Sequence, residues 1–229
     1  MGIFGRRGWR AAAATVAVAA AGTAWLHPHV GAEGRAPANA ASAESPAVDL
    51  TALLTQVTVV DRIDDVPGYE RSCAKGARCV FGPAWNDPTD RSGCDARSRI
   101  LRAQLQGARF KPNTHNCKVT DGYLDPDPYT GQRIDLHNID VDHVVPLRRS
   151  WNAGAWKWDV KRRQMFANDP VELIAVSAHA NRSKGDGGLD VWLPDYQPCV
   201  YVAKYLTAAV KYQLPIAASE RDVAIKTCG

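Results

Sequence analysis

The apolar positions of the chain come in short runs separated by stretches rich in Gly, Pro and Asp, which predicts a mixture of short strands and helices. Strands are predicted at Lys118–Leu124, Arg133–Leu136, Leu173–Val176 and in an extended segment from Ile139 up to Pro146. The first two flank Asp127–Gly131, whose Pro and Gly are typical of a tight turn. Leu50–Val60 alternates weakly and predicts either a helix or a strand.

Residues that cap helices mark the predicted helices. Asp95 can cap a helix that runs to about Gln106, and Ser177 can cap the helix Ala178–Lys184, which Gly185 ends. Further helices are predicted at about Asp159–Phe166, Val200–Lys211 and Ser219–Thr227, the last with a capping-box pattern from Ser219 to Asp222. The stretches Pro67–Thr89 and Leu147–Pro170 are predicted as long connections, the second interrupted only by the short helix.

The N-terminus has the layout of a secretory signal peptide. Three arginines in the first ten residues precede the uncharged, alanine-rich Ala11–Leu26, and small residues suited to cleavage follow at Val30–Ala32 or Ala38–Ala40. The sixteen-residue run is short for a membrane anchor. We therefore expect a signal peptide (1–32), a flexible Ala/Pro/Ser linker (33–47) and a single domain (48–229), without stable membrane association after cleavage.

Export permits disulfides, and all six cysteines lie beyond the predicted leader. Six cysteines allow 15 pairings, of which we favour the sequential one. It joins Cys73 to Cys79, Cys94 to Cys117 and Cys199 to Cys228. The chain has no CxxC motif, which disfavours a thiolate zinc site.

The candidate catalytic and metal-binding residues lie where two predicted strands and a helix follow one another in the sequence. The first strand ends at Asp142-His143, and the helix after the second strand presents Asn181. A carboxylate and an amide oxygen suit Mg²⁺ or Mn²⁺, and a neutral imidazole can take a proton from water. Adjacent strand residues point to opposite faces, so a strand end or bulge is required for Asp142 and His143 to serve one site.

At these residues the sequence resembles the HNH endonucleases, also called the His-Me finger or ββα-metal type. More narrowly, it resembles secreted bacterial proteins related to the C-terminal nuclease domain of GmrSD-type restriction enzymes. The resemblance covers about Cys94 to Cys228. It rests on the Asp142-His143 pair and on segments in family-like order: Cys94–Arg97, Asp127–Gly131, Trp151–Trp158, Ala167–Pro170, Asn181–Asp186, Trp192–Pro194 and the last two cysteines.

The resemblance implies a role for each residue of the motif. His143 would be the general base, Asp142 and Asn181 the metal ligands, and Asn168 the middle residue that orients the active loop by hydrogen bonding. Independently of the resemblance, we expect the neighbouring basic residues Arg182 or Lys184 to contact the substrate phosphate. Asn181 stands where zinc sites of this type have histidine, which argues against Zn²⁺. His179, two residues earlier on the same helix, would face away from the metal.

The net charge of the whole chain does not indicate a nucleic-acid substrate, but the charge of one segment does. The whole chain has 28 basic and 24 acidic side chains, a net +4. Residues Arg148–Lys184 contain eight basic and three acidic side chains, and this local excess next to the motif suits a polyanion. An ordinary solvated face is the alternative, above all for Lys161-Arg162-Arg163.

We therefore expect an α+β fold with a ββα-metal core (about 132–186), flanking helices and three stabilising disulfides. The expected protein is a secreted, monomeric endonuclease that needs Mg²⁺ or Mn²⁺ and prefers DNA to RNA. The main alternative is an exported nucleic-acid-binding module without catalysis. A metal-dependent hydrolase of another phosphoester is a third hypothesis.

Overall fold

The computed structural model describes residues 49–229, so the predicted leader and linker (1–47) lie outside the described residues. The helices are α1 (Leu50–Gln56), α2 (Ala96–Gln104), α3 (Leu147–Asn152), α4 (Val160–Asn168), α5 (Ala178–Lys184), α6 (Pro198–Tyr212) and α7 (Ala218–Cys228). The strands are β1 (Val59–Val60), β2 (Gln106–Phe110), β3 (Val119–Leu124), β4 (Ile134–Asp135), β5 (Ile139–His143), β6 (Leu173–Ser177) and β7 (Ile216–Ala217). Single 3₁₀ turns occur at Leu136–Asn138 and Ala155–Lys157. The fold is α+β, as predicted.

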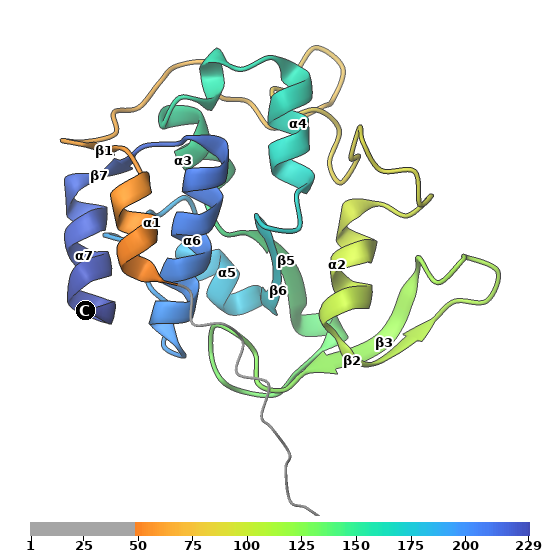
Figure 1. The fold of residues 1–229 in the computed structure, drawn as a ribbon. Helices are drawn as coiled ribbons and strands as arrows, with labels where there is room; N and C mark the ends of the chain where they lie inside the picture. The colour runs from red at the N-terminus through yellow and green to blue at the C-terminus, as the bar shows by residue number, and fades with distance from the viewer. Residues whose placement is uncertain (1–48) are drawn as a thin grey trace, which may run out of the picture. The chain divides into compact units, whose positions relative to one another are not determined.

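The strands form three small sheets. β1 pairs with β7 in parallel, β2, β3 and β4 form an antiparallel sheet in that order, and β5 pairs with β6 antiparallel. The β5–β6 pair lies between two helical layers, with α1, α6 and α7 on one side and α2 with the β2–β3 hairpin on the other (Figure 1). α5 follows β6 directly and packs on both strands of the pair.

Side chains on the two faces of β5–β6 enter two separate hydrophobic clusters. Ile139 and Val141 pack on Ile100 and Leu101 of α2. On the opposite face, Val176 belongs to the larger cluster with α6. Because successive strand residues point to opposite faces, the alternation along β5 decides which layer each side chain enters.

The predicted elements around β5 agree with the structure. β3, β5, β6 and α5 lie where the sequence predicts them, and Leu50–Val60 resolves into helix α1 followed by strand β1. The Asp95 carboxylate caps α2 by accepting from the Ser98 amide at 2.6 Å. Ser177 caps α5, and Gly185 ends it with a positive φ of 55°, a conformation that glycine adopts without steric cost.

Three elements differ from the prediction. The strand expected at Arg133–Leu136 is reduced to β4, and Leu136 begins a 3₁₀ turn instead. The helix expected to reach Gln106 ends at Gln104, and Gln106–Phe110 form strand β2 instead. The connection after Pro146 contains helix α3, which buries Leu147 and Trp151 one turn apart. A helix of six residues offers a single apolar pair, which is too little periodicity to recognise in sequence.

The predicted capping box at Ser219 is wrong. α7 begins one residue earlier, with Ala217 at the N-cap, and Glu220 accepts from the Ala217 amide at 2.8 Å. The Ser219 hydroxyl donates to Asp190, and Asp222 accepts from Arg221. Glu220 is fully buried and also pairs with Arg149 at 2.6 Å, so a distant arginine draws this carboxylate to the helix start.

The three predicted disulfides are confirmed. Cα–Cα distances are 4.4 Å for Cys73–Cys79, 5.1 Å for Cys94–Cys117 and 5.4 Å for Cys199–Cys228, within the range disulfides adopt. The last bond joins the start of α6 to the end of α7. Within residues 49–229, no helix combines the length and the apolar character needed to cross a bilayer.

Candidate active site

The candidate residues Asp142 and His143 end strand β5 in a regular ladder. Asp142 pairs with Ile174 and His143 with Leu173, without a register shift. Their side chains therefore point to opposite faces of the strand pair. The bulge or strand-end deviation that would bring both to one point does not occur in this structure, so the two side chains have different surroundings.

On the first face, His143 is buried and held by two contacts. Its side chain is 7% exposed, and Nε2 lies 2.9 Å from the carbonyl oxygen of Ala167. Because a carbonyl can only accept, Nε2 carries the proton and Nδ1 is left as the acceptor. The Trp85 ring stacks on the imidazole with 5.6 Å between centroids and 10° between planes. These contacts fix both the tautomer and the orientation of the ring.

Burial and, to a smaller extent, the nearby Arg71 guanidinium lower the pKa of His143 to about 3. Both effects disfavour the imidazolium, the first through lost hydration and the second through like charge. The ring is therefore neutral at ordinary pH and able to accept a proton.

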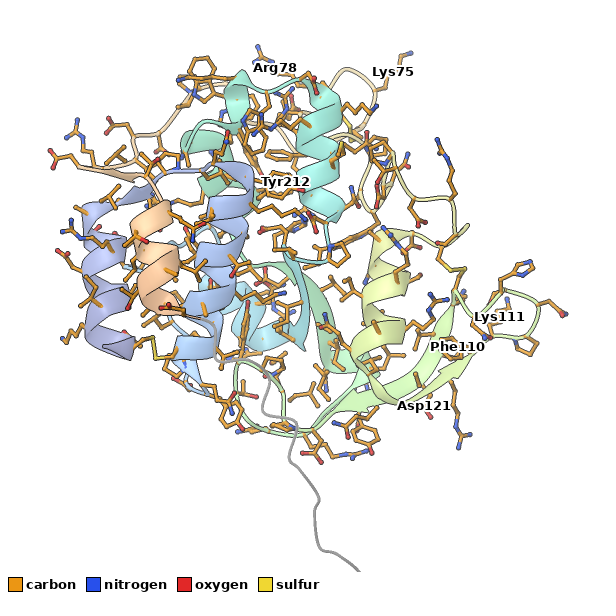
Figure 2. The ribbon with its side chains drawn as sticks, viewed as in Figure 1. Lys75, Arg78, Phe110, Lys111, Asp121 and Tyr212 are labelled. Carbon is orange, nitrogen blue, oxygen red and sulfur yellow. A yellow bond between two sulfur atoms is a disulfide. The ribbon has the colours of Figure 1, made fainter. Side chains whose placement is uncertain are left out.

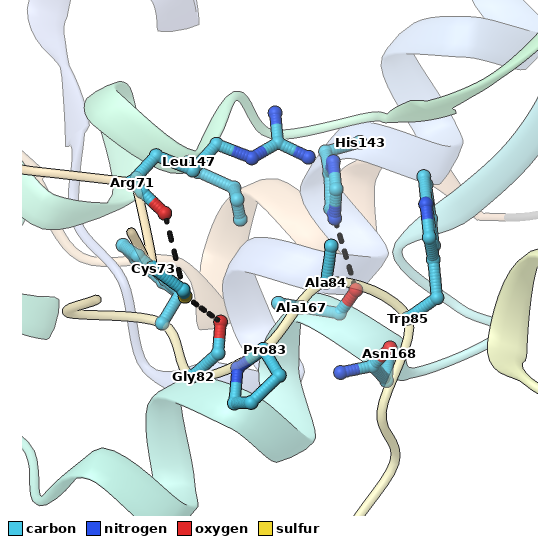
Figure 3. Close-up of a pocket in the computed structure, with 11 residues that line it drawn as sticks. Arg71, Cys73, Gly82, Pro83, Ala84, Trp85, His143, Leu147, Ala167 and Asn168 are labelled. Carbon is cyan, nitrogen blue, oxygen red and sulfur yellow. Dashed lines mark hydrogen bonds between the residues drawn. The ribbon is translucent and has the colours of Figure 1, made fainter. Parts of the chain in front are cut away.

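A cavity of about 140 Å³ opens beside this histidine (Figure 3). Its lining includes Arg71, Trp85, His143, Leu147 and Asn168. Figure 3 shows the Arg71 side chain extending toward the imidazole. The cavity therefore joins a proton acceptor to a cationic side chain. Sequence reasoning missed Arg71 and Trp85 because both lie in an aperiodic loop, and no local pattern relates that loop to His143.

Asn168 closes the same cavity from the end of α4. Its amide nitrogen donates to the carbonyl oxygens of Gln164 at 2.8 Å and Asn86 at 3.2 Å. These bonds tie α4 to the loop that carries Trp85. The side chain is 2% exposed, and its Oδ1 is a buried acceptor with no partner among the described residues.

On the second face, Asp142 forms a buried ion pair with Lys184. The Lys184 ammonium lies 3.0 Å from Oδ1 and 2.8 Å from Oδ2, and it also donates to the carbonyl oxygen of His143 at 2.8 Å. The Tyr129 hydroxyl donates to Oδ2 at 2.7 Å. Lys184 is fully buried, so the structure does not place it where a substrate phosphate could reach it. Desolvation and the Asp142 charge raise the pKa of Tyr129, so this hydroxyl keeps its proton.

Asn181 lies beside Asp140 rather than Asp142. Its amide nitrogen is 3.5 Å from the Asp140 carboxylate, and Arg182 approaches the same carboxylate at 4.0 Å. Arg182 is mostly exposed, but on the face opposite the His143 cavity. Asp140, which the sequence analysis left out, points to the same face as Asp142 because it lies two residues earlier on the strand.

This arrangement does not fit a cation held between Asp142 and Asn181. The two oxygen types suit Mg²⁺, but both Asp142 oxygens already accept from Lys184, and one also accepts from Tyr129. No group of three or more His, Cys, Asp or Glu side chains within residues 49–229 converges as a metal site.

The basic excess of Arg148–Lys184 is smaller on the surface than in the sequence. Three of its side chains are held internally. Arg149 pairs with the buried Glu220, Arg163 is buried and donates to the Val80 carbonyl at 2.5 Å, and Lys184 pairs with Asp142. The other five are exposed and can contact a polyanion, although Arg148 also pairs with Asp186 and Arg162 also donates to the Tyr212 carbonyl oxygen.

Comparison with known proteins identifies the family. Residues 95–225 match the family described as "GmrSD restriction endonucleases, C-terminal domain". A similar protein from the fungus Arthroderma benhamiae (strain ATCC MYA-4681 / CBS 112371), described as "Uncharacterized secreted protein", is 33% identical over 134 residues. That match covers 56% of this chain and 64% of the relative, so the chain spans less than two thirds of its length. No solved structure matches the chain.

The family match spans more than half of the chain and includes β5, β6 and α5. It contains all six residues for which the sequence predicts a role at the site: Asp142, His143, Asn168, Asn181, Arg182 and Lys184. The chain belongs to the family of the C-terminal domain of GmrSD restriction endonucleases.

Proposed function

We propose that this protein is a secreted endonuclease that hydrolyses phosphodiester bonds of nucleic acid, with His143 as the general base. Its family is that of a restriction-endonuclease domain, which points to a nuclease-type enzyme. The observation that carries the proposal is the His143 cavity, where a neutral imidazole with one nitrogen anchored on Ala167 stands beside a cationic side chain.

In the proposed reaction, Nδ1 of His143 accepts a proton from a water molecule in the cavity. The water oxygen forms a bond to phosphorus as the bond to the 3′ oxygen breaks, and the leaving oxygen takes a proton from solvent. General-base catalysis of this kind contributes about 10²–10⁴-fold to the rate. A base of low pKa is weak, but an anionic phosphate in the cavity would raise the pKa of His143 by favouring the imidazolium.

In this mechanism Asn168 would be a positioning residue for the His143 ring. Its bonds to Gln164 and Asn86 hold the end of α4, which supplies the Ala167 carbonyl, and the loop that supplies Trp85. Both contacts of the His143 ring therefore depend on this asparagine.

Enzymes of the HNH type generally use a divalent metal, and the sequence predicts Mg²⁺ or Mn²⁺ at Asp142 and Asn181. Because the arrangement of these residues does not fit a shared ion, the proposed reaction does not include a metal-bound step. Metal dependence stays a prediction, which chelation of the purified protein tests.

Three disulfides and a relative described as secreted support an extracellular location. We propose DNA as the preferred substrate and a monomer as the active form, as the sequence analysis expects. Exposed basic side chains such as Arg148 and Arg182 support binding to a polyanion without selecting DNA or RNA.

The test is digestion of supercoiled plasmid DNA and of a folded RNA by the secreted, oxidised protein. It is run with Mg²⁺, with Mn²⁺ and with EDTA, beside His143→Ala. We expect cleavage of the DNA that His143→Ala loses. Tight binding of DNA without cleavage under any of these conditions would instead identify the non-catalytic binding module.

A further inference from the structure

Most of the wall of the His143 cavity comes from outside the segment that matches the family. Of the eleven residues that line it, four lie within residues 95–225 and seven lie between Arg71 and Trp85. The family-matched segment thus supplies the histidine, and the preceding loop encloses it.

This loop is held in place by several contacts. The Cys73–Cys79 disulfide closes its tip, and the Val80 amide donates to the Glu70 carbonyl at 3.0 Å. Phe81 is buried and packs on Phe166 of α4, with 6.4 Å between ring centroids. Gln164 of α4 donates to the Asn86 carbonyl at 2.6 Å. Arg71, two residues before the disulfide, therefore stands on an anchored segment.

The Arg71 guanidinium has no carboxylate partner among the residues that the structure describes. Its side chain is exposed and still lines the cavity beside His143. By contrast, Lys75 in the same loop is exposed but does not line the cavity, and Figure 2 shows it with Arg78 at the outer edge of the molecule.

We propose that Arg71 binds the scissile phosphate of the nucleic-acid substrate and places it next to His143. The guanidinium presents paired N–H donors that match two phosphate oxygens, and an unpaired arginine at the mouth of the cavity can make such a contact without breaking another. The inference rests on the proposed function, because it assigns the substrate phosphate to the cavity of the general base. It also gives the disulfide-closed loop a role in substrate positioning.

The test compares Arg71→Ala and Arg71→Lys with the matched control Lys75→Ala. Cleavage is followed as kcat/KM on DNA. Affinity for a short single-stranded DNA oligonucleotide, and its dependence on salt, are measured in His143→Ala alone and combined with Arg71→Ala or with Lys75→Ala, so that no cleavage interferes. Thiol titration and denaturant unfolding show whether each variant keeps its disulfides and stability.

We expect Arg71→Ala to lower kcat/KM by about 10–100-fold, the usual worth of a charge-assisted hydrogen bond. Arg71→Lys should recover part of the loss, and Lys75→Ala should stay near the wild type. In the His143→Ala background, Arg71→Ala should reduce the salt slope of binding by about one unit. A purely structural role would not move that slope.

Equal cleavage and equal salt slopes for Arg71→Ala and Lys75→Ala would overturn the inference while leaving the nuclease proposal intact. If the wild-type protein cleaves no nucleic acid, the proposed function fails instead. The two failures are distinguishable because the oligonucleotide-binding arm does not depend on cleavage.

Discussion

The two faces of strand β5 end in adjacent residues with opposite surroundings. His143 faces a cavity, has one ring nitrogen bound to Ala167 and lies near Arg71, for which no carboxylate of residues 49–229 forms an ion pair. Asp142 faces the interior, where Lys184 and Tyr129 satisfy both of its oxygens. The first face can still react with a ligand, whereas the second is closed by its own hydrogen bonds. The difference supports the proposal that His143 is the general base, and it gives the Asp142–Lys184 pair the structural role of holding the strand end in position.

The largest expected effect on stability concerns this ion pair. Lys184→Met leaves Asp142 as a buried carboxylate without its counterion, which should cost about 3–5 kcal/mol in the free energy of unfolding. The double variant Asp142→Asn with Lys184→Met removes both charges and should recover most of the loss. Urea unfolding measures all three proteins. If Lys184→Met costs less than ~1 kcal/mol, the second face is not closed as described.

The pH dependence of stability tests the first face. Burial lowers the pKa of His143 to about 3 in the folded protein, below the ordinary value of 6.5. Between these values the unfolded chain binds a proton that the folded chain does not, so stability falls as pH falls through this window and is fully present above it. At about 1.4 kcal/mol for each pH unit, the loss of stability should reach roughly 3 kcal/mol between pH 6.5 and pH 4.

His143→Gln supplies the control for that measurement, because glutamine does not titrate. The free energies of unfolding of the two proteins, measured at a series of pH values, should diverge progressively below pH 6.5, with the wild type losing more stability. If the free energies of unfolding of both proteins change in parallel down to pH 4, the imidazole is not desolvated in the folded protein.

A smaller effect on stability is expected from divalent metal. It distinguishes the Asp142–Lys184 ion pair of the structure from the metal site that the sequence predicts at Asp142. Since Lys184 occupies the Asp142 oxygens, millimolar Mg²⁺ or Mn²⁺ should leave the melting temperature of the wild type unchanged. In Lys184→Met the Asp142 carboxylate is free, and either ion should raise the free energy of unfolding by roughly 1–3 kcal/mol. If the wild type is instead stabilised, and Asp142→Asn and Asn181→Ala lose the effect, the metal ligands predicted from the sequence are correct and Lys184 leaves Asp142 when metal binds.

The smallest expected effect is that of Tyr129. Tyr129→Phe removes one hydrogen bond to Asp142 but leaves both contacts with Lys184, so it should cost ~1 kcal/mol. The partly exposed Asp140→Ala is the matched control on the same face, and it should lie within about 0.5 kcal/mol of the wild type. A Tyr129→Phe loss as large as that of Lys184→Met would mean that tyrosine, not lysine, holds the carboxylate.

The sequence predicts the elements that carry the candidate residues because their signals are local. Ser177 and Gly185 bracket α5, and sequential pairing joins the cysteines correctly. Pairing across the fold is not local. Nothing near Lys184 in the sequence shows that its ammonium reaches Asp142, and net charge does not reveal that Arg163 donates to backbone carbonyls.

The cavity could not be predicted for a similar reason. Arg71 and Trp85 meet His143 because a disulfide and buried aromatic contacts fold an aperiodic loop onto α4. A strand pattern does give the alternation of Asp142 and His143, and the regular register of β5 with β6 then places them on opposite faces. The sequence therefore predicts the position of the histidine, whereas the structure supplies its surroundings.

The most direct test of the central claim is chemical rescue of His143→Ala in a DNA cleavage assay. His143→Ala should lose about 10²–10⁴-fold in rate while keeping its disulfides, and added imidazole should restore part of the activity by entering the space left by the ring. The exposed His179 provides the control, and His179→Ala should cleave at the wild-type rate. Full activity in His143→Ala, or loss only in His179→Ala, would contradict the assignment of His143 as the base.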